Sequence, residues 1–71
     1  MTRILKINGI DREFAETAWP GSVAELLVHL QIDQATVVAE IDGLIVQRSD
    51  FAQTPLLEGQ SIELIRFVGG G

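Results

Sequence analysis

The chain has 71 residues, of which 46% are hydrophobic, and this composition predicts a single domain with a buried core and excludes an intrinsically disordered protein. It contains no cysteine, which excludes disulfides, thiolate metal sites and sulfur carried on a side chain, and with one histidine no metal site is expected. The formal net charge is −5 and the five basic residues are scattered along the chain, so neither nucleic acid nor an anionic membrane is an expected partner.

The first part of the chain predicts a β-hairpin. Residues 3–8 alternate apolar and polar side chains, as a strand with one buried face does. Asn8 and Gly9 then predict a two-residue turn, because a type I′ turn needs positive φ at both of its central positions. A second strand is expected over residues 10–16, with Phe14 as its anchor in the core.

A short helix is predicted next. Ser22 followed by Glu25 matches a capping box, in which each side chain accepts a hydrogen bond from the backbone N–H of the other residue. The helix is expected to end near Gln31 after two to three turns, so it must pack on a sheet to persist. Its apolar residues have the i, i+3, i+4, i+7 spacing of one helix face: Val23, Leu26, Leu27 and Leu30.

The second half of the chain predicts three further strands. Residues 36–41 and 44–47 form a hairpin around a turn at Asp42 and Gly43. Residues 48–59 are expected to be irregular, because Pro55 is incompatible with a central strand. The last strand, residues 61–67, directs Ile62 and Leu64 to the core and Glu63, Ile65 and Phe67 to the other face.

This order of elements predicts an α+β fold of the β-grasp type. A mixed sheet of four to five strands packs on one main helix, and the first and last strands pair in parallel at the centre of the sheet. We expect a domain over residues 1–68 and a flexible tail over residues 69–71, Gly-Gly-Gly.

No side-chain cluster predicts an active site, so we do not expect an enzyme. Asp11 and Glu13 share one strand face and are expected to be solvated, and His29 is expected on the helix surface. Trp19 and Phe51 are expected to cover the core rather than to bind a ligand. No apolar run approaches the roughly 18 residues of a membrane span and no signal peptide is recognisable, so we expect a cytoplasmic protein.

The terminal glycines have two interpretations of equal weight. One is an inert flexible tail. In the other, Gly69 and Gly70 give the thin approach that passes through a narrow channel of a partner enzyme, and the α-carboxylate of Gly71 reacts there. Activation of that carboxylate as an acyl adenylate needs ATP, and the chain has neither a nucleotide-binding loop nor a cysteine. Partners must therefore supply the ATP site and the sulfur, and this chain binds no cofactor.

Several stretches resemble one known family. The segment from Glu40 to Gly71, EIDGLIVQRSDFAQTPLLEGQSIELIRFVGGG, is similar to the carboxyl-terminal half of the ThiS family, the sulfur carriers of thiamine biosynthesis. The opening LKING at residues 5–9 and the helix VAELL at residues 23–27 match the same family at the expected positions. Two positions depart from it: Gln47, where the family often has proline, and Phe51, where it often has tryptophan.

The resemblance implies a ubiquitin-like β-grasp protein that is a co-substrate of enzymes. A ThiF-type adenylyltransferase would transfer AMP from ATP to Gly71, and sulfur drawn from cysteine through a cysteine desulfurase would convert that terminus to a thiocarboxylate. The thiazole synthase ThiG would accept the sulfur. Three alternatives stay open: a MoaD-like small subunit of molybdopterin synthase, a ubiquitin-like protein modifier, and an interaction domain with an inert tail.

The last strand also predicts a partner-binding surface. Ile65 and Phe67 are expected on the face opposite the core, directly before Val68 and the tail. An exposed apolar pair at this position suits docking of a partner. The alternative is that residues 48–59 fold over Ile65 and Phe67, and the sequence favours neither.

Overall fold

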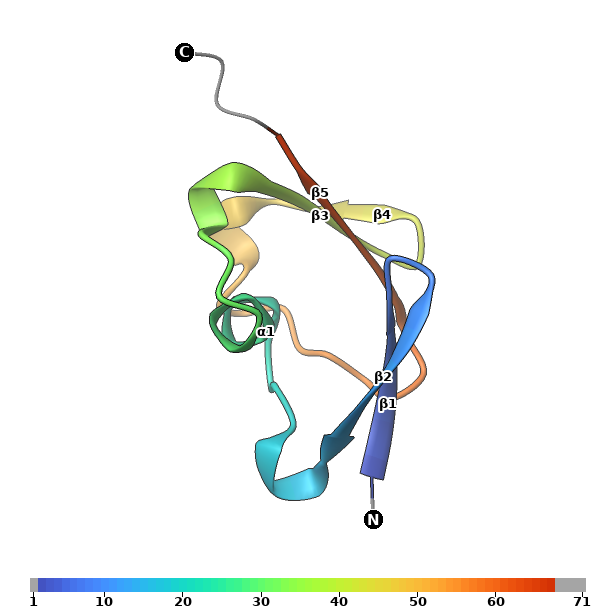
Figure 1. Cartoon of the computed structure of the whole chain (residues 1–71). Coiled ribbons are helices and arrows are strands. Elements are labelled where there is room, and N and C mark those ends of the chain that lie inside the picture. The colour runs from blue at the N-terminus through green and yellow to red at the C-terminus, as the bar shows by residue number, and fades with distance from the viewer. Residues whose placement is uncertain (1, 68–71) are drawn as a thin grey trace.

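The computed structural model describes residues 2–67, and in that range one α-helix packs across one face of a five-stranded mixed sheet (Figure 1). Across the sheet the strand order is β2-β1-β5-β3-β4. This is the predicted β-grasp arrangement. The elements are β1 (Thr2–Ile7), β2 (Ile10–Ala15), η1 (Glu16–Ala18), α1 (Val23–His29), η2 (Gln34–Thr36), β3 (Val37–Ile41), β4 (Leu44–Val46), η3 (Arg48–Asp50) and β5 (Ser61–Arg66), where η marks a single turn of 3₁₀-helix.

Strand β5 lies in the middle of the sheet, parallel to β1 and antiparallel to β3. Its Ile62 and Leu64 are buried under α1, whereas Glu63 and Ile65 are exposed on the opposite face. The predicted alternation is therefore confirmed. Because β5 runs parallel to β1, the start of β1 and the end of β5 lie at opposite ends of the domain (Figure 1).

The core lies between the sheet and α1. Burial of this much apolar surface is the main favourable contribution to folding. The helix contributes the predicted residues Val23, Leu26 and Leu27 to this core, and Leu30 is partly buried against it. The buried hydrophobic residues are Leu5, Ile7, Phe14, Val23, Leu26, Leu27, Val37, Ala39, Ile41, Phe51, Leu56, Ile62 and Leu64.

Both predicted two-residue hairpin turns are present. Asn8 and Gly9 have φ of 51° and 80°, and Asp42 and Gly43 have φ of 50° and 86°. Asparagine and aspartate tolerate this left-handed conformation better than other side chains do, and glycine adopts it freely. The turns thus fix the registers of β1 with β2 and of β3 with β4.

The side chains of the two turn residues bind β5. The backbone N–H of Asn8 donates to Ile62 O at 2.8 Å, and its side chain continues this ladder: Oδ1 accepts from Leu64 N–H at 2.7 Å and Nδ2 donates to Leu64 O at 3.3 Å. On the other side of β5, Asp42 N–H donates to Ser61 O at 2.8 Å and Asp42 Oδ1 accepts from Ser61 N–H at 3.0 Å. In each case the backbone turns away and the side-chain oxygen replaces the carbonyl that a continuing strand would offer.

The amino-terminal cap of α1 is half of the predicted capping box. Ser22 Oγ accepts from Glu25 N–H at 3.2 Å, as expected. The prediction that the Glu25 carboxylate accepts from Ser22 N–H is wrong, because that carboxylate accepts from Gly21 N–H instead. The missing side chain at Gly21 permits this contact: a Cβ there would lie 2.8 Å from Glu25 Oε2.

The irregular connection between β4 and β5 completes that cap. Thr54 O accepts from Val23 N–H at 3.1 Å, and Phe51 O accepts from Ala24 N–H at 3.0 Å. These N–H groups lie in the first turn of the helix and have no partner within it. The Phe51 side chain is 1% exposed, so the same segment adds a large side chain to the core.

Asn8 is expected to stabilise the domain through its side chain as well as its turn conformation. Asn8→Gly keeps the positive φ and removes both bonds to Leu64, so we expect a loss of about 1–2 kcal/mol in the free energy of unfolding. Asn8→Ala also loses both hydrogen bonds but, unlike glycine, keeps a Cβ in the left-handed region without the polar group that lets asparagine tolerate it, so it should cost about 1 kcal/mol more than Asn8→Gly. Urea denaturation of the three proteins measures this order, and equal stability of Asn8→Gly and wild type would contradict it.

Candidate functional site

The site is the end of the domain where β5 finishes. The Phe67 N–H donates to Thr36 O at 3.1 Å, one residue after β5 ends at Arg66. The fold therefore fixes the backbone to this point, at one end of the sheet (Figure 1). The residues predicted to react or to give access, Gly69, Gly70 and Gly71, and the predicted contact residue Val68 lie outside the described residues.

On the sheet face that α1 does not cover, four apolar residues lie near the end of β5, and we call them the sheet-face patch: Val38, Ile45, Ile65 and Phe67. Ile65 pairs directly with Val38 of the neighbouring strand. Ile65 and Phe67 are each 51% exposed, and Ile45 is 65% exposed. Sequence reasoning named Ile65 and Phe67 and missed the other two. The alternation of β3, with Val37 and Ala39 inward, was the signal that places Val38 outward.

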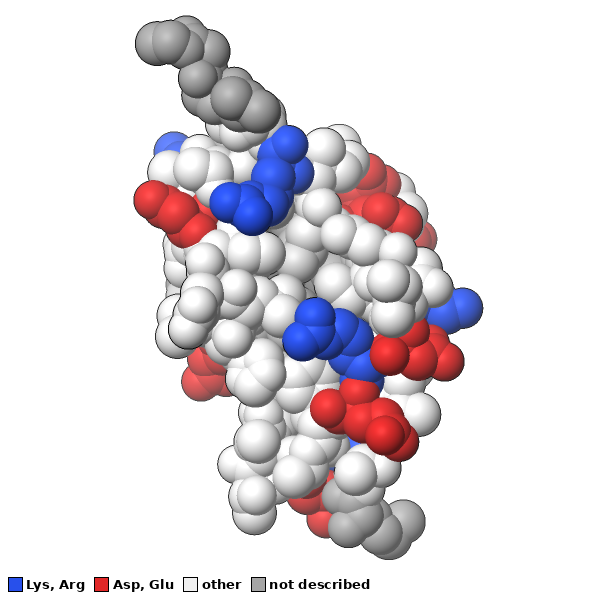
Figure 2. All heavy atoms as spheres, in the orientation of Figure 1, with Lys and Arg blue, Asp and Glu red and all other residues white. Residues whose placement is uncertain are grey.

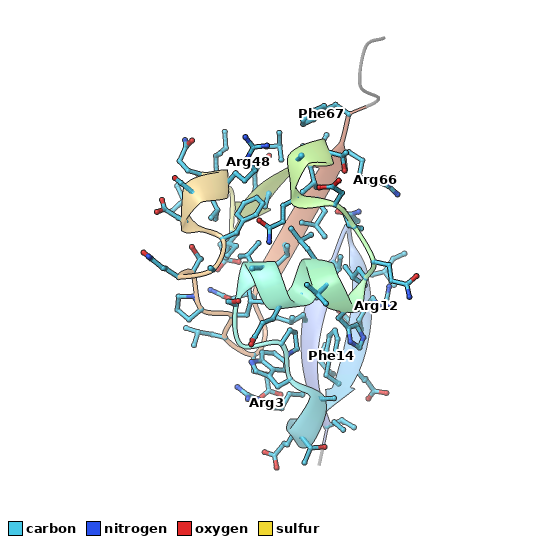
Figure 3. The ribbon with its side chains drawn as sticks, turned by 90° about the vertical axis from the view of Figure 1, so that its left-hand side faces the viewer. Arg3, Arg12, Phe14, Arg48, Arg66 and Phe67 are labelled. Carbon is cyan, nitrogen blue, oxygen red and sulfur yellow. The ribbon has the colours of Figure 1, made fainter. Side chains whose placement is uncertain are left out.

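Phe67 also lines a shallow hollow beside the patch. The hollow has a volume of about 320 Å³, and Val38, Ile45 and Arg48 are among its other lining residues. Phe67 and Arg48 lie at the same end of the domain (Figure 3). The site thus combines an apolar surface with one cation beside the end of β5.

The connection at residues 48–59 leaves this face open. Its buried side chains, Phe51 and Leu56, belong to the core on the helix side of the sheet. Ile65 and Phe67 therefore stay half exposed, and the alternative that this connection covers them is wrong. A role of these residues in binding a partner stays a prediction.

The sheet-face patch borders a pair of acidic residues. Glu40 and Glu63 are direct cross-strand neighbours on this face, and Glu40 also pairs with Ile45. Two like charges directly opposite each other on a sheet are unfavourable. A partner that brings a basic group to this position would relieve that repulsion, so the electrostatics of the patch favour a basic surface.

The other residues considered as catalytic or metal-binding groups do not form a common site in the described part of the chain. Asp11, Glu13 and His29 are exposed, and the His29 ring packs edge-on against Phe14 with centroids 5.2 Å apart. Among residues 2–67, no three His, Cys, Asp or Glu side chains are grouped as a metal site would require. In the same range, no helix has the length and apolar character needed to cross a bilayer.

Comparison with known proteins places the sequence among curated relatives. The sulfur carrier protein ThiS of Bacillus subtilis is 28% identical over 68 residues, which is 96% of this chain and 100% of that protein. A thiazole synthase of Paramagnetospirillum magneticum is 36% identical over 67 residues, which is 94% of this chain. The chain spans only 20% of the length of that thiazole synthase.

Solved structures agree with these matches. The crystal structure of a thiamine biosynthesis protein (ThiS) from Geobacter metallireducens superposes with a TM-score of 0.77 at 33% identity, covering 96% of this chain and 99% of that one. A solution structure from the same organism has a TM-score of 0.75, also at 33% identity, and covers 96% and 87%. The model of the ThiS family matches residues 5–71. The chain belongs to the ThiS family.

Proposed function

We propose that this protein is a sulfur carrier that delivers sulfur, as a carboxyl-terminal thiocarboxylate on Gly71, for the thiazole part of thiamine. The observation that carries the proposal is the family match over residues 5–71, which includes the terminal glycines. A second support is the Bacillus subtilis relative, which bears the name of a sulfur carrier and aligns over its whole length. Both favour the thiamine carrier over the MoaD-like subunit and the protein modifier.

The chemistry resides at the backbone terminus. A carboxylate oxygen of Gly71 attacks the α-phosphorus of ATP on a ThiF-type adenylyltransferase and releases pyrophosphate. A sulfur nucleophile then displaces AMP and leaves the thiocarboxylate. The chain has no cysteine, so a side-chain persulfide is not available to it. In this proposal the protein is a cytoplasmic co-substrate with no cofactor of its own, and Gly69 and Gly70 pass through a channel that excludes side chains.

A thiazole synthase of the ThiG type is the proposed acceptor of the sulfur. The similarity to a part of the Paramagnetospirillum magneticum thiazole synthase supports this pairing. In the cell, a cysteine desulfurase is the proposed origin of the sulfur. The carrier thus meets at least two enzymes, one that activates its terminus and one that takes sulfur from it.

The fold supports this role by fixing the strand from which the reactive end extends. β5 is hydrogen-bonded along both sides, and Phe67 N–H is bonded to Thr36 O. The exposed sheet-face patch lies directly before the tail. A partner that docks on Ile65 and Phe67 thereby receives the terminus from a defined point and direction.

Thiocarboxylate formation is tested by intact-mass analysis. The full-length protein is incubated with ATP, a ThiF-type enzyme and sodium sulfide, in which hydrosulfide displaces AMP without a further reductant. The mass should rise by the difference between one sulfur and one oxygen atom, and the product should then support thiazole formation by thiazole synthase. The matched variant lacking Gly70 and Gly71 should show no change. A modified truncated variant, or an unmodified full-length chain, would contradict the proposal.

Docking through the patch is tested with Phe67→Ala. Loss of this half-exposed ring should weaken binding to the ThiF-type enzyme roughly tenfold, because aromatic anchors dominate interface energetics. Calorimetry measures the affinity and urea denaturation verifies that the variant is folded. Leu57→Ala, which removes an apolar side chain that is 60% exposed elsewhere, is the control and should bind normally. Unchanged affinity of a folded Phe67→Ala protein would exclude the docking role.

A further inference from the structure

A second hollow lies on the helix side of the domain, and it carries two arginines. Its volume is about 310 Å³, and it forms where the segment after α1 meets β1, β2 and β5. We call it the arginine hollow. Arg12 and Arg66 line it together with Asn8, whose side-chain amide is bonded to Leu64, and its apolar lining residues are Ile7, Ile10, Leu30, Ile32 and Leu64.

The pleat of the sheet brings the two arginines to this hollow. Arg12 lies two residues before the buried Phe14 and so faces the helix side of β2. Arg66 follows the buried Leu64 by two residues and faces the same side of β5. Inner-face positions like these are normally covered, but both arginines are exposed. Figure 3 shows the two side chains on one side of the domain. Figure 2, in the orientation of Figure 1, shows the Lys and Arg side chains of that view as separate groups rather than as one basic patch.

These two arginines differ from Arg3 in their surroundings. The Arg3 guanidinium lies 4.1 Å from the centroid of the Trp19 ring, and its Nε is 3.7 Å from Glu58 Oε1. Among residues 2–67, no carboxylate oxygen lies within 4.0 Å of a side-chain nitrogen of Arg12 or Arg66. In a protein of net charge −5, two of the five cations therefore line one apolar hollow and form no ion pair within residues 2–67.

We propose that the arginine hollow binds an acidic segment of a partner protein. An aliphatic side chain of that segment occupies the hollow, and flanking carboxylates bind Arg12 and Arg66, since a guanidinium pairs well with a carboxylate. A nucleic acid suits the surface less well, because two cations amid net negative charge cannot follow a phosphate backbone. The apolar lining also favours a peptide over a free anion.

The position of the arginine hollow indicates which class of partner protein carries the acidic segment. Arg66 is the last residue of β5 and directly precedes Phe67, so the hollow adjoins the end of the domain from which the tail continues. The partner is then an enzyme that receives the carboxyl terminus, and this identification rests on the proposed function. The sheet-face patch, with Glu40 and Glu63, favours a basic surface, whereas the arginine hollow on the other side of the sheet favours an acidic one. The two faces thus recognise opposite charges.

The proposal is tested by titrating the ¹⁵N-labelled full-length protein with a short synthetic peptide in which glutamates flank leucine and isoleucine. The matched peptide has lysine in place of glutamate. We expect amide shifts centred on Arg12, Leu30, Ile32 and Arg66 with the acidic peptide only, and weaker binding as salt increases. Shifts centred on the sheet-face patch, no saturable shifts, or affinity no higher than that of inorganic phosphate would each overturn the proposal.

Two double variants of equal charge separate local contacts from net charge. The double variant Arg12→Gln, Arg66→Gln should raise the dissociation constant of the acidic peptide about tenfold, because it removes two partly screened ion pairs whose individual effects on the dissociation constant multiply. Lys6→Gln with Arg48→Gln removes the same charge elsewhere and should leave it within about twofold. Equal losses in both would overturn the proposal. Because the titration involves no sulfur chemistry, its outcome is independent of whether Gly71 forms a thiocarboxylate.

Discussion

Strand β5 must be held on both sides, because the last residues of the chain extend from it. β1 and β3 supply backbone ladders, and the turns that follow these strands supply further bonds through Asn8 and Asp42. β5 thus pairs in parallel with β1 on one side and antiparallel with β3 on the other. These flanking strands have only six and five residues, and the turn side chains extend their hydrogen bonding to β5. The consequence is a fixed backbone up to Phe67 at one end of a very small domain.

The helix depends on a segment that is far away in sequence. With seven residues, α1 is too short to be stable alone, and its first N–H groups would have no partners. The connection between β4 and β5 provides two of these partners and buries Phe51 beneath itself. This stretch, which the sequence predicted only to be irregular, therefore joins the helix to the sheet. Its packing on the helix side also leaves the opposite face of the sheet free.

The two faces of the sheet then differ in what they present. One carries the apolar patch with a repulsive pair of glutamates, and the other carries a hollow with two arginines. Under the proposed function the carrier meets more than one enzyme, so it has to bind each in turn and release it. Faces of opposite electrostatic preference allow different partners to be recognised close to the same terminus without sharing one contact surface.

The sequence by itself determined the strands, the helix stripe and both turns, because alternation, helical spacing and the need for positive φ are local properties of the chain. The central parallel pair followed from the order of these elements, which is typical of a β-grasp fold. It also indicated that Ile65 and Phe67 face away from the core. Only the tertiary structure decided the rest. The bonds of Asn8 to Leu64, of Phe51 O to the helix, and the shared hollow of Arg12 and Arg66 join residues 27 to 56 positions apart, and no local pattern encodes such pairs. Arg12 and Arg66 therefore come to line one hollow only once the sheet has formed.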